Sequence, residues 1–381
     1  MNRVPMSNRL VWAQLMRPQI PLVYLDINHF IYLARATEGD EAAPHGYVEL
    51  LAASRSAARE QRAVFPLSCE HLWELSAIRD PKQRTRIADV MEELSGFNYL
   101  LGRAEIAQLE IDAGIRDIFE EPPDALALPL IRPTFGWAFG MRGGMSIRNI
   151  DGSDATGSAR QAMGREKHEQ FIRHANYTVE RAMLDGPRDE EIPLLRSEHG
   201  YAPEAAREGA ASRLAYELDL SERLAKNGRW RRGRLRDVVS AREIAHEWLD
   251  AINRVNEQRV RAGKRPLALD DDVRTRQLMA AMPQSQVAIS IKSRYHRDSN
   301  QNWTTNDITD IDAMSVAYAY CDAVFTDKAV RAALANSTEL RVVNTYLPRT
   351  PVQLAGWLDR LPHLAIPDML VPHPAKPARC A

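Results

Sequence analysis

The sequence is poor in cysteine and carries almost no net charge, and both features narrow the classes of protein to consider. Its three cysteines, Cys69, Cys321 and Cys380, are an odd number without the spacing of a metal site. They favour free thiols in a reducing cytoplasm over a disulfide framework. The net charge of −1 provides no global field for a polyanion, so any affinity for nucleic acid must come from local patches.

Long apolar runs and several common catalytic motifs are also missing. No apolar run approaches the length of a membrane span, and residues 1–20 lack the hydrophobic stretch of a signal peptide. The segment "GMRGGM" lacks the Gly-Lys-Ser/Thr ending of a phosphate-binding loop. The nucleophile elbow of serine hydrolases is absent, and no His–Cys pair is apparent. We therefore expect a cytoplasmic protein, not bound to membranes, whose chemistry needs no catalytic nucleophile.

The segment "PLVYLDINHFIYLARA", residues 21–36, joins an apolar run to an acid. Residues 22–25 are a run of β-forming apolar residues, typical of a strand buried on both faces of a parallel sheet. Asp26 follows, then Asn28, and then the apolar face of a helix. Open α/β sheets bind ligands at the carboxyl ends of their strands. Asp26 or Asn28 could equally cap the helix, and this segment alone does not separate the two interpretations.

A second acidic segment lies about 280 residues later, within residues 303–330. Asp307, Asp310 and Asp312 stand at the start of an expected helix, and a short apolar strand, residues 323–325, is followed by Thr326 and Asp327. Burying several unpaired carboxylates together costs several kcal/mol each, and a cation removes that cost. Oxygen ligands without Cys or paired His favour Mg²⁺ or Mn²⁺ over zinc.

Three segments, "LVYLDINHF", "FPLSCEHLWEL" and "NDITDIDAMSVAYAYCDAVFTDK", resemble the motifs of PIN-like domains, a superfamily of metal-dependent ribonucleases. The family pattern is an Asp after the first strand with Asn, Ser or Thr two positions on, a Glu on the helix after the second strand, an Asp opening a later helix, and a Thr-Asp after the fourth strand. The matching positions are Asp26 with Asn28, Glu74, Asp310, and Thr326 with Asp327. The resemblance covers the two ends of the chain, roughly half of it.

The resemblance implies that one or two Mg²⁺ or Mn²⁺ ions activate a water that cleaves RNA. The catalytic and metal-binding residues would be Asp26, Glu74, Asp310 and Asp327, with Glu74 binding directly or through water. The supporting residues would be Asn28, Asp307, Asp312 and Thr326. On the helix of Glu74, we interpret Glu70 as its solvated neighbour and His71 as a packing or hydrogen-bonding residue, because no second His stands at ligand spacing.

The expected fold is α/β, a PIN-like parallel sheet flanked by helices, interrupted by a large all-helical insertion. The sheet domain would comprise residues 19–105 and 280–362, and the insertion residues 106–279, with a loose tail at 363–381. Residues 1–20 would form a leading turn or short helix. We also expect a second strand at residues 63–68, a last strand at 339–348, and a closing helix capped by Thr350 with Pro351 at its first position.

Two basic clusters are candidates for nucleic-acid binding. Lys292, Arg294 and Arg297 precede the acidic helix, where they could hold RNA or complete a helix C-terminus. Arg231 and Arg232 adjoin Trp230, a combination suited to single-stranded nucleic acid but also to a solvated helix start or a partner contact. RNA is expected from the resemblance, and DNA is not excluded. The helical insertion could serve as a lid, a homodimer interface or a surface for a protein partner.

Two other classes of protein compete with a ribonuclease. The first is a non-catalytic module that binds nucleic acid or a partner through a degenerate acidic site. The second is a phosphoryl-transfer enzyme acting on a small molecule, which is disfavoured because Asn28 replaces the second Asp of the D-x-D pair. Toxin, phage-defence effector and RNA-processing enzyme are all compatible with the ribonuclease hypothesis.

Overall fold

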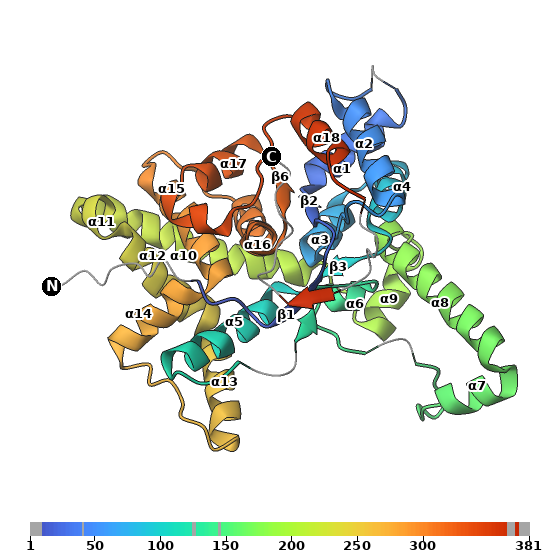
Figure 1. Cartoon of the computed structure of the whole chain (residues 1–381), viewed down its shortest axis with the longest axis horizontal. Coiled ribbons are helices and arrows are strands. Elements are labelled where there is room, and N and C mark those ends of the chain that lie inside the picture. Colours follow the sequence, from blue (N-terminus) through green and yellow to red (C-terminus); the bar gives the residue numbers. More distant parts are fainter. Residues whose placement is uncertain (1–9, 40–41, 124–126, 144–145, 364–369, 373–381) are drawn as a thin grey trace.

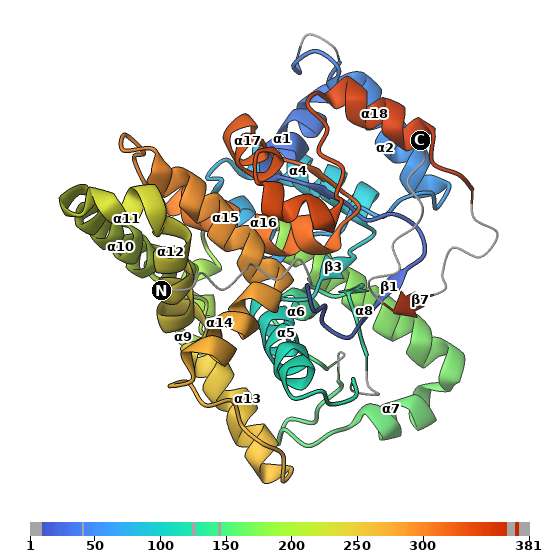
Figure 2. The same cartoon turned by 60° about the vertical axis from the view of Figure 1, so that its left-hand side comes forward.

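Helices make up most of the structure, and the strands between them are short. A computed structural model of the chain describes residues 10–39, 42–123, 127–143, 146–363 and 370–372, and 65% of the protein is helical (Figures 1 and 2). Within the described ranges, we find no helix that is both long and apolar enough to cross a membrane. The predicted tail, residues 363–381, lies outside the described residues except for His363 and a short strand at 370–372.

The elements fall into an N-terminal group, a middle group and a C-terminal group. The first contains β1 (Leu15–Pro18), β2 (Val23–Leu25), α1 (Ile27–Ala36), α2 (Tyr47–Arg59), α3 (Cys69–Ala77), α4 (Pro81–Ser95) and β3 (Tyr99–Leu100). The middle contains α5 (Arg103–Ile118), β4 (Leu128–Pro129), β5 (Ile131–Arg132), α6 (Phe135–Ala138), α7 (Thr156–Met163), α8 (Arg165–Asp185), α9 (Ile192–His199), α10 (Glu204–Lys226), α11 (Gly228–Gly233), α12 (Leu235–Glu243), the π-helical turn η1 (Ile244–Trp248), α13 (Leu249–Arg261) and α14 (Asp272–Ala281). The last contains α15 (Pro283–Arg297), α16 (Thr305–Tyr320), β6 (Ala323–Phe325), α17 (Lys328–Ala335), the 3₁₀ helix η2 (Thr338–Val343), α18 (Pro351–Asp359) and β7 (Leu370–Pro372).

The two strands predicted to end in aspartates form and pair with each other. β2 and β6 are parallel, with Val23 opposite Ala323 and Leu25 opposite Phe325. Single parallel bridges extend the pair on both sides, joining Leu22 to Val64, Leu67 to Tyr99, and Ala323 to Tyr346. The expected parallel sheet is therefore present as a two-stranded sheet with isolated bridges beside it. The predicted strand at residues 63–68 is reduced to two bridges, and Pro66 within it has no N–H to donate.

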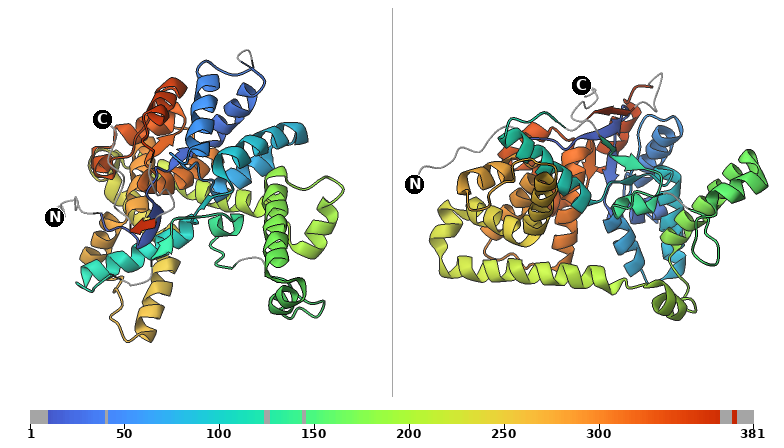
Figure 3. Two further views of the ribbon diagram at one scale, coloured as in Figure 1. Left: turned by 45° about the vertical axis from the view of Figure 1, so that its right-hand side comes forward. Right: turned by 90° about the horizontal axis from the view of Figure 1, so that it is seen from below.

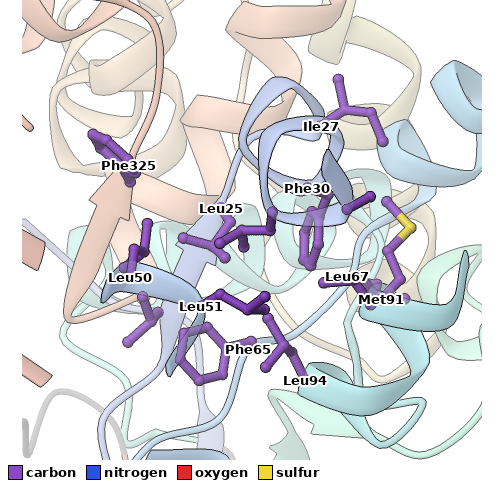
Figure 4. Packing of buried hydrophobic residues seen from close by; sticks show 14 of the residues in the cluster. Leu25, Ile27, Phe30, Leu50, Leu51, Phe65, Leu67, Met91, Leu94 and Phe325 are labelled. Carbon is purple, nitrogen blue, oxygen red and sulfur yellow. The ribbon is translucent and has the colours of Figure 1, made fainter. Parts of the chain in front are cut away.

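The packing around β2 confirms that this strand is buried on both faces. Val23 and Leu25 belong to a cluster with α1, α2 and α4, in which Leu25 lies near Phe30 and Phe65 (Figure 4). Leu22 and Tyr24 belong to a second cluster with α15 and α16. Successive side chains of a strand point to opposite faces, so one short run supplies both clusters. The closing helix α18 begins as predicted, because the Thr350 hydroxyl accepts a hydrogen bond from the Gln353 N–H at 3.2 Å.

Strands also form where none was expected. β1 pairs in parallel with β4 and antiparallel with β7, while β3 pairs antiparallel with β5. Residues 15–18 are therefore a strand rather than a turn or short helix, and Arg17, fully buried, forms an ion pair with Asp322 at the start of β6. The all-helical prediction for residues 106–279 is wrong at β4 and β5. These strands are two residues long, too short to show an alternating pattern.

The predicted last strand, residues 339–348, is also wrong. Its first half is the 3₁₀ helix η2, and only Tyr346 bridges to the sheet. Leu340 and Val343 are buried whereas Val342 is exposed, a spacing of three that fits the 3₁₀ period rather than strand alternation. Asn344, in the left-handed region at φ 58°, then ends the helix.

The helices of the middle group pack against one another and against helices of the other two groups, as α8 does on α4 and α12 on α15. A third apolar cluster joins α5, α10, α12, α13 and α14, and it includes Ile111, Leu224 and Trp248. Figure 3 shows α10 running along one side of the molecule, whereas α7 and α8 project from the other end. The long α10 also packs on α16. The middle of the chain thus packs against α16, the helix that carries Asp310.

Candidate acidic active site

Asp26 serves as a helix cap and also faces the candidate site. Its Oδ1 accepts a hydrogen bond from the Asn28 N–H at 3.4 Å, so it caps α1, and the Thr326 hydroxyl donates to its Oδ2 at 3.2 Å. The Asp26 N–H donates to the Phe325 carbonyl at 3.0 Å, which fixes this residue to the end of β6. The two interpretations left open by the sequence are therefore compatible, because capping occupies only one carboxylate oxygen.

Asp327 occupies the matching position after β6. Its Oδ1 accepts hydrogen bonds from the Ala329 and Val330 N–H groups, so it caps α17. No described residue donates a hydrogen bond to its Oδ2. Because β2 and β6 are parallel and in register, their carboxyl ends place Asp26 and Asp327 at one edge of the sheet.

Glu74 and Asp310 come from two helices and have neither a hydrogen-bond nor an ion-pair partner among the described residues. The helix of Glu74, α3, is fixed to the end of β2 by His71. The Ser68 N–H donates to Nδ1 of His71 at 3.0 Å, so Nε2 carries the proton and donates to the Leu25 carbonyl at 2.7 Å. This confirms the hydrogen-bonding role predicted for His71, and burial lowers its pKa to about 4.

Burial and neighbouring acids raise the pKa values of Asp26, Glu74 and Asp310. Burial raises the pKa of Asp310 to about 8, with further contributions from Asp26, Asp327 and Asp307. Burial likewise raises the pKa of Glu74 to about 9, and Asp26, Asp310 and Glu70 add to the effect. Glu70 is 5% exposed, so the prediction that it is a solvated neighbour is wrong. The pKa of Asp26 rises by burial and by the charge of Asp327. Segments spread across the whole chain therefore bring their carboxylates into one electrostatically coupled group, which we call the acidic cluster: Asp26, Glu74, Asp310 and Asp327.

The acidic cluster is not a preformed coordination shell. Among the described residues, no three His, Cys, Asp or Glu side chains are placed so that they could hold a metal ion together. The donor set is nonetheless all oxygen, which fits Mg²⁺ or Mn²⁺. Glu74 and Asp310 have no hydrogen bonds to the described residues that a rearrangement would break. The residues thus fit a hard divalent cation in their chemistry, provided that the carboxylates draw together around it.

The predicted supporting residues have separate positions. Thr326 binds Asp26, and Asn28 is exposed at the start of α1. Asp307 forms a capping box on α16, accepting hydrogen bonds from the Thr304 N–H at 2.6 Å and the Thr304 hydroxyl at 2.7 Å. Asp312 does not support the acidic cluster as predicted, because it forms ion pairs with Arg213 and Arg103 behind α16.

Tyr295 is a residue of this region that sequence analysis missed. It is 8% exposed on α15, and its ring lies 5.5 Å from the ring of Trp303. Burial raises the pKa of its hydroxyl, and the charges of Asp327, Asp307 and Asp310 raise it further, so the phenol stays protonated beside the acidic cluster. Its neighbourhood in the sequence, "KSRYHR", drew attention only to the basic residues.

Lys292 is buried in an ion network, which corrects its assignment to nucleic-acid binding. It is 3% exposed, and its Nζ lies 2.8 Å from Glu243 and 3.0 Å from Glu217. The network also contains Arg103, Arg213, Glu247, Asp312 and His296, contributed by α5, α10, η1, α16 and α15. By contrast, Arg294 and Arg297 are exposed at the end of α15, Arg232 is exposed and Arg231 is half-buried on α11.

Replacing Lys292 by Met is expected to destabilise the protein by about 3 kcal/mol or more, because it leaves buried glutamates without their cation. Denaturant unfolding of the variant would measure this loss. Lys226→Met, at the exposed end of α10, is the control and should change the free energy of unfolding by less than about 0.5 kcal/mol. Equal effects of the two substitutions would show that the network contributes nothing to stability.

The chain was compared with protein-family models, with curated proteins and with solved structures, and none of these comparisons found a match.

Proposed function

We propose that the protein is a metal-dependent endonuclease that cleaves RNA at the acidic cluster, on a PIN-like fold. The observation that carries the proposal is the convergence of four carboxylates, two of them without any partner among the described residues. Buried carboxylates that repel one another destabilise a fold, and such arrangements concentrate at functional sites. A divalent cation would neutralise these carboxylates, and a phosphodiester is the substrate on which such a cation could act.

The order of parallel pairings supports the PIN-like part of the proposal. Bridges and strand pairs run from Tyr99 through residues 64–67 and β2 to β6 and then Tyr346. Asp26 and Asp327 follow the two central strands, and Glu74 lies on the helix after residues 64–67. A ligand at the carboxyl ends of parallel strands is the general arrangement of open α/β folds.

In the proposed mechanism, Asp26, Asp310 and Asp327 would hold Mg²⁺ or Mn²⁺, and Glu74 would bind the ion directly or through water. When bound, the cation would supply a water of lowered pKa and neutralise charge on the phosphate. Thr326 orients Asp26 through its hydrogen bond to Oδ2. The protonated hydroxyl of Tyr295 can donate a hydrogen bond to a phosphate oxygen. Arg294 and Arg297, exposed at the end of the same helix, are placed to contact neighbouring phosphates.

One observation favours a second candidate, a module that binds nucleic acid or a partner through a degenerate acidic site. The described residues contain no preformed metal site, and the lack of such a site is what we would expect of an inactive descendant of a nuclease. Calorimetry with Mn²⁺ separates the two candidates. A nuclease should release or absorb heat that disappears when Asp26 is replaced, whereas the module should show no heat that depends on a carboxylate.

Cleavage of labelled RNA tests the proposal. We expect the wild type to cleave RNA with Mn²⁺ and not with EDTA, and we expect Asp26→Asn to lose this activity. Asn retains an oxygen that can accept the hydrogen bond from the Asn28 N–H, so the cap of α1 is preserved while the charge is lost. Cleavage that persists in EDTA, or equal cleavage by the variant, would exclude the acidic cluster as the active site.

A further inference from the structure

Two exposed aromatic rings lie together beside the helix of Glu74. Trp73 on α3 is 38% exposed, and Phe139, directly after α6, is 42% exposed. Their ring centroids are 6.2 Å apart, with an angle of 57° between the ring planes. The two residues are far apart in the sequence, so the tertiary fold, not local sequence, brings the rings together. Met141, 58% exposed, lies against Gly136 of α6.

Both rings are attached to fixed parts of the structure. α3 is held to the end of β2 by the hydrogen bond from His71 to the Leu25 carbonyl. The short helix α6 is anchored by Trp137, which is 1% exposed and whose carbonyl accepts a hydrogen bond from the Gly102 N–H. The backbone N–H of Phe135 donates to the Glu180 carboxylate at 3.0 Å. Because these segments are already fixed, a ligand that binds the two rings would immobilise few further side chains or backbone groups.

The position of the rings relative to the acidic cluster indicates what they bind. Trp73 directly precedes Glu74, and successive residues of a helix lie about 100° apart around its axis, so the rings lie on the face of α3 next to the one that carries Glu74. The carboxylates repel the phosphates of an approaching strand, and the nearby Arg142 is paired with Glu105 at 3.0 Å. Stacking on a nucleobase provides attraction without a second charged contact. Bases inside a duplex cannot present their faces, so such a contact requires an unpaired nucleotide.

We propose that Trp73 and Phe139 form a stacking platform for an unpaired base of the RNA, next to the phosphate at the acidic cluster. This inference rests on the proposed function for the identity of the ligand. The platform supplies affinity on the side of the cluster formed by α3, and Arg294 and Arg297 contact the strand from the side formed by α15. A hydrophobic protein partner at the same patch is the competing outcome, and it predicts no dependence on bases.

The test measures binding apart from cleavage. Anisotropy of a labelled RNA strand of about twelve nucleotides would be followed in the Asp310→Asn background, in which cleavage is expected to be slow, with and without Trp73→Ala. Stacking is worth about 1–3 kcal/mol per base, so Trp73→Ala should weaken binding at least about fivefold, and Trp73→Phe should restore most of the affinity. Phe171→Ala, on α8 and 48% exposed, is the control and should leave affinity unchanged.

A second strand with abasic sites at its central positions makes the test specific for stacking. We expect this strand to bind the parent more weakly, and Trp73→Ala to cause no further loss with it. Unchanged affinity in Trp73→Ala, or an equal loss with both strands, would overturn the platform. If the wild type cleaves RNA in a metal-dependent way and Trp73→Ala has no effect on binding, the proposed function stands without the platform. If binding depends on Trp73 but no metal-dependent cleavage occurs, the platform stands and the nuclease proposal fails.

Discussion

Replacing Asp310 by Asn is expected to lower the rate of Mn²⁺-dependent RNA cleavage on the order of 10³-fold. Asp310 interacts electrostatically with Asp26, Asp327 and Glu74, so it lies centrally in the acidic cluster. Under the proposed function, loss of its charge would remove a cation ligand and several kcal/mol of the electrostatic stabilisation available to the transition state. Single-turnover cleavage of labelled RNA at saturating Mn²⁺ measures the effect on the chemical step.

A surface carboxylate provides the control for this substitution. The Asp272 side chain is 84% exposed on α14, where its weak ion pair with Arg276 spans 3.7 Å. Asp272→Asn removes the same charge from the protein without touching the acidic cluster, so its cleavage rate should equal that of the wild type. A rate for Asp310→Asn within tenfold of the control would mean that Asp310 is not a ligand in the reaction.

Asp310→Asn is also expected to stabilise the metal-free protein, increasingly so as the pH rises. The pKa of Asp310 is about 8 in the folded protein, above its ordinary value of 3.8. The protonated Asp310 side chain therefore makes its full contribution to stability below the pKa of the unfolded chain, 3.8, and this contribution is lost as the pH rises through 8. Between pH 5 and pH 8 the wild type should lose roughly 4 kcal/mol of unfolding free energy relative to the variant.

Urea unfolding of both proteins in EDTA at several pH values measures this difference. Glu74→Gln should show the same direction, because the pKa of Glu74 is raised to about 9. A gain in stability on removal of a functional acid is the usual consequence of an active site that destabilises its fold. A stability difference between wild type and Asp310→Asn that stays constant with pH would show that Asp310 is not held in a charge-repelling environment.

The sequence predicts best those elements whose signals are local. The strands at residues 23–25 and 323–325 have continuous apolar runs, and the closing helix has the cap Thr350 and Pro351 at its start. In each case a few adjacent residues determine the conformation. The acids after the two strands could be identified for the same reason, because the end of a strand and its following acid are neighbours in the chain.

Features that depend on partners from elsewhere in the chain could not be predicted. Lys292 has the composition of a basic patch, but its surroundings are glutamates of α10, α12 and η1. The two-residue strands β4 and β5 exist only because β1 and β3 lie beside them. Tyr295 and Trp73 belong to ordinary helical patterns, and only the fold places one beside the acidic cluster and the other against Phe139.

A crystal of the protein soaked in Mn²⁺, with anomalous diffraction recorded near the manganese edge, tests the role of the acidic cluster most directly. We expect one or two peaks between Asp26, Asp310 and Asp327, with Glu74 bound to the ion or to its water, and no peak in a crystal of Asp310→Asn. A crystal without a peak at the acidic cluster, or with manganese only at other sites, would contradict the proposal that a cation draws these four carboxylates together.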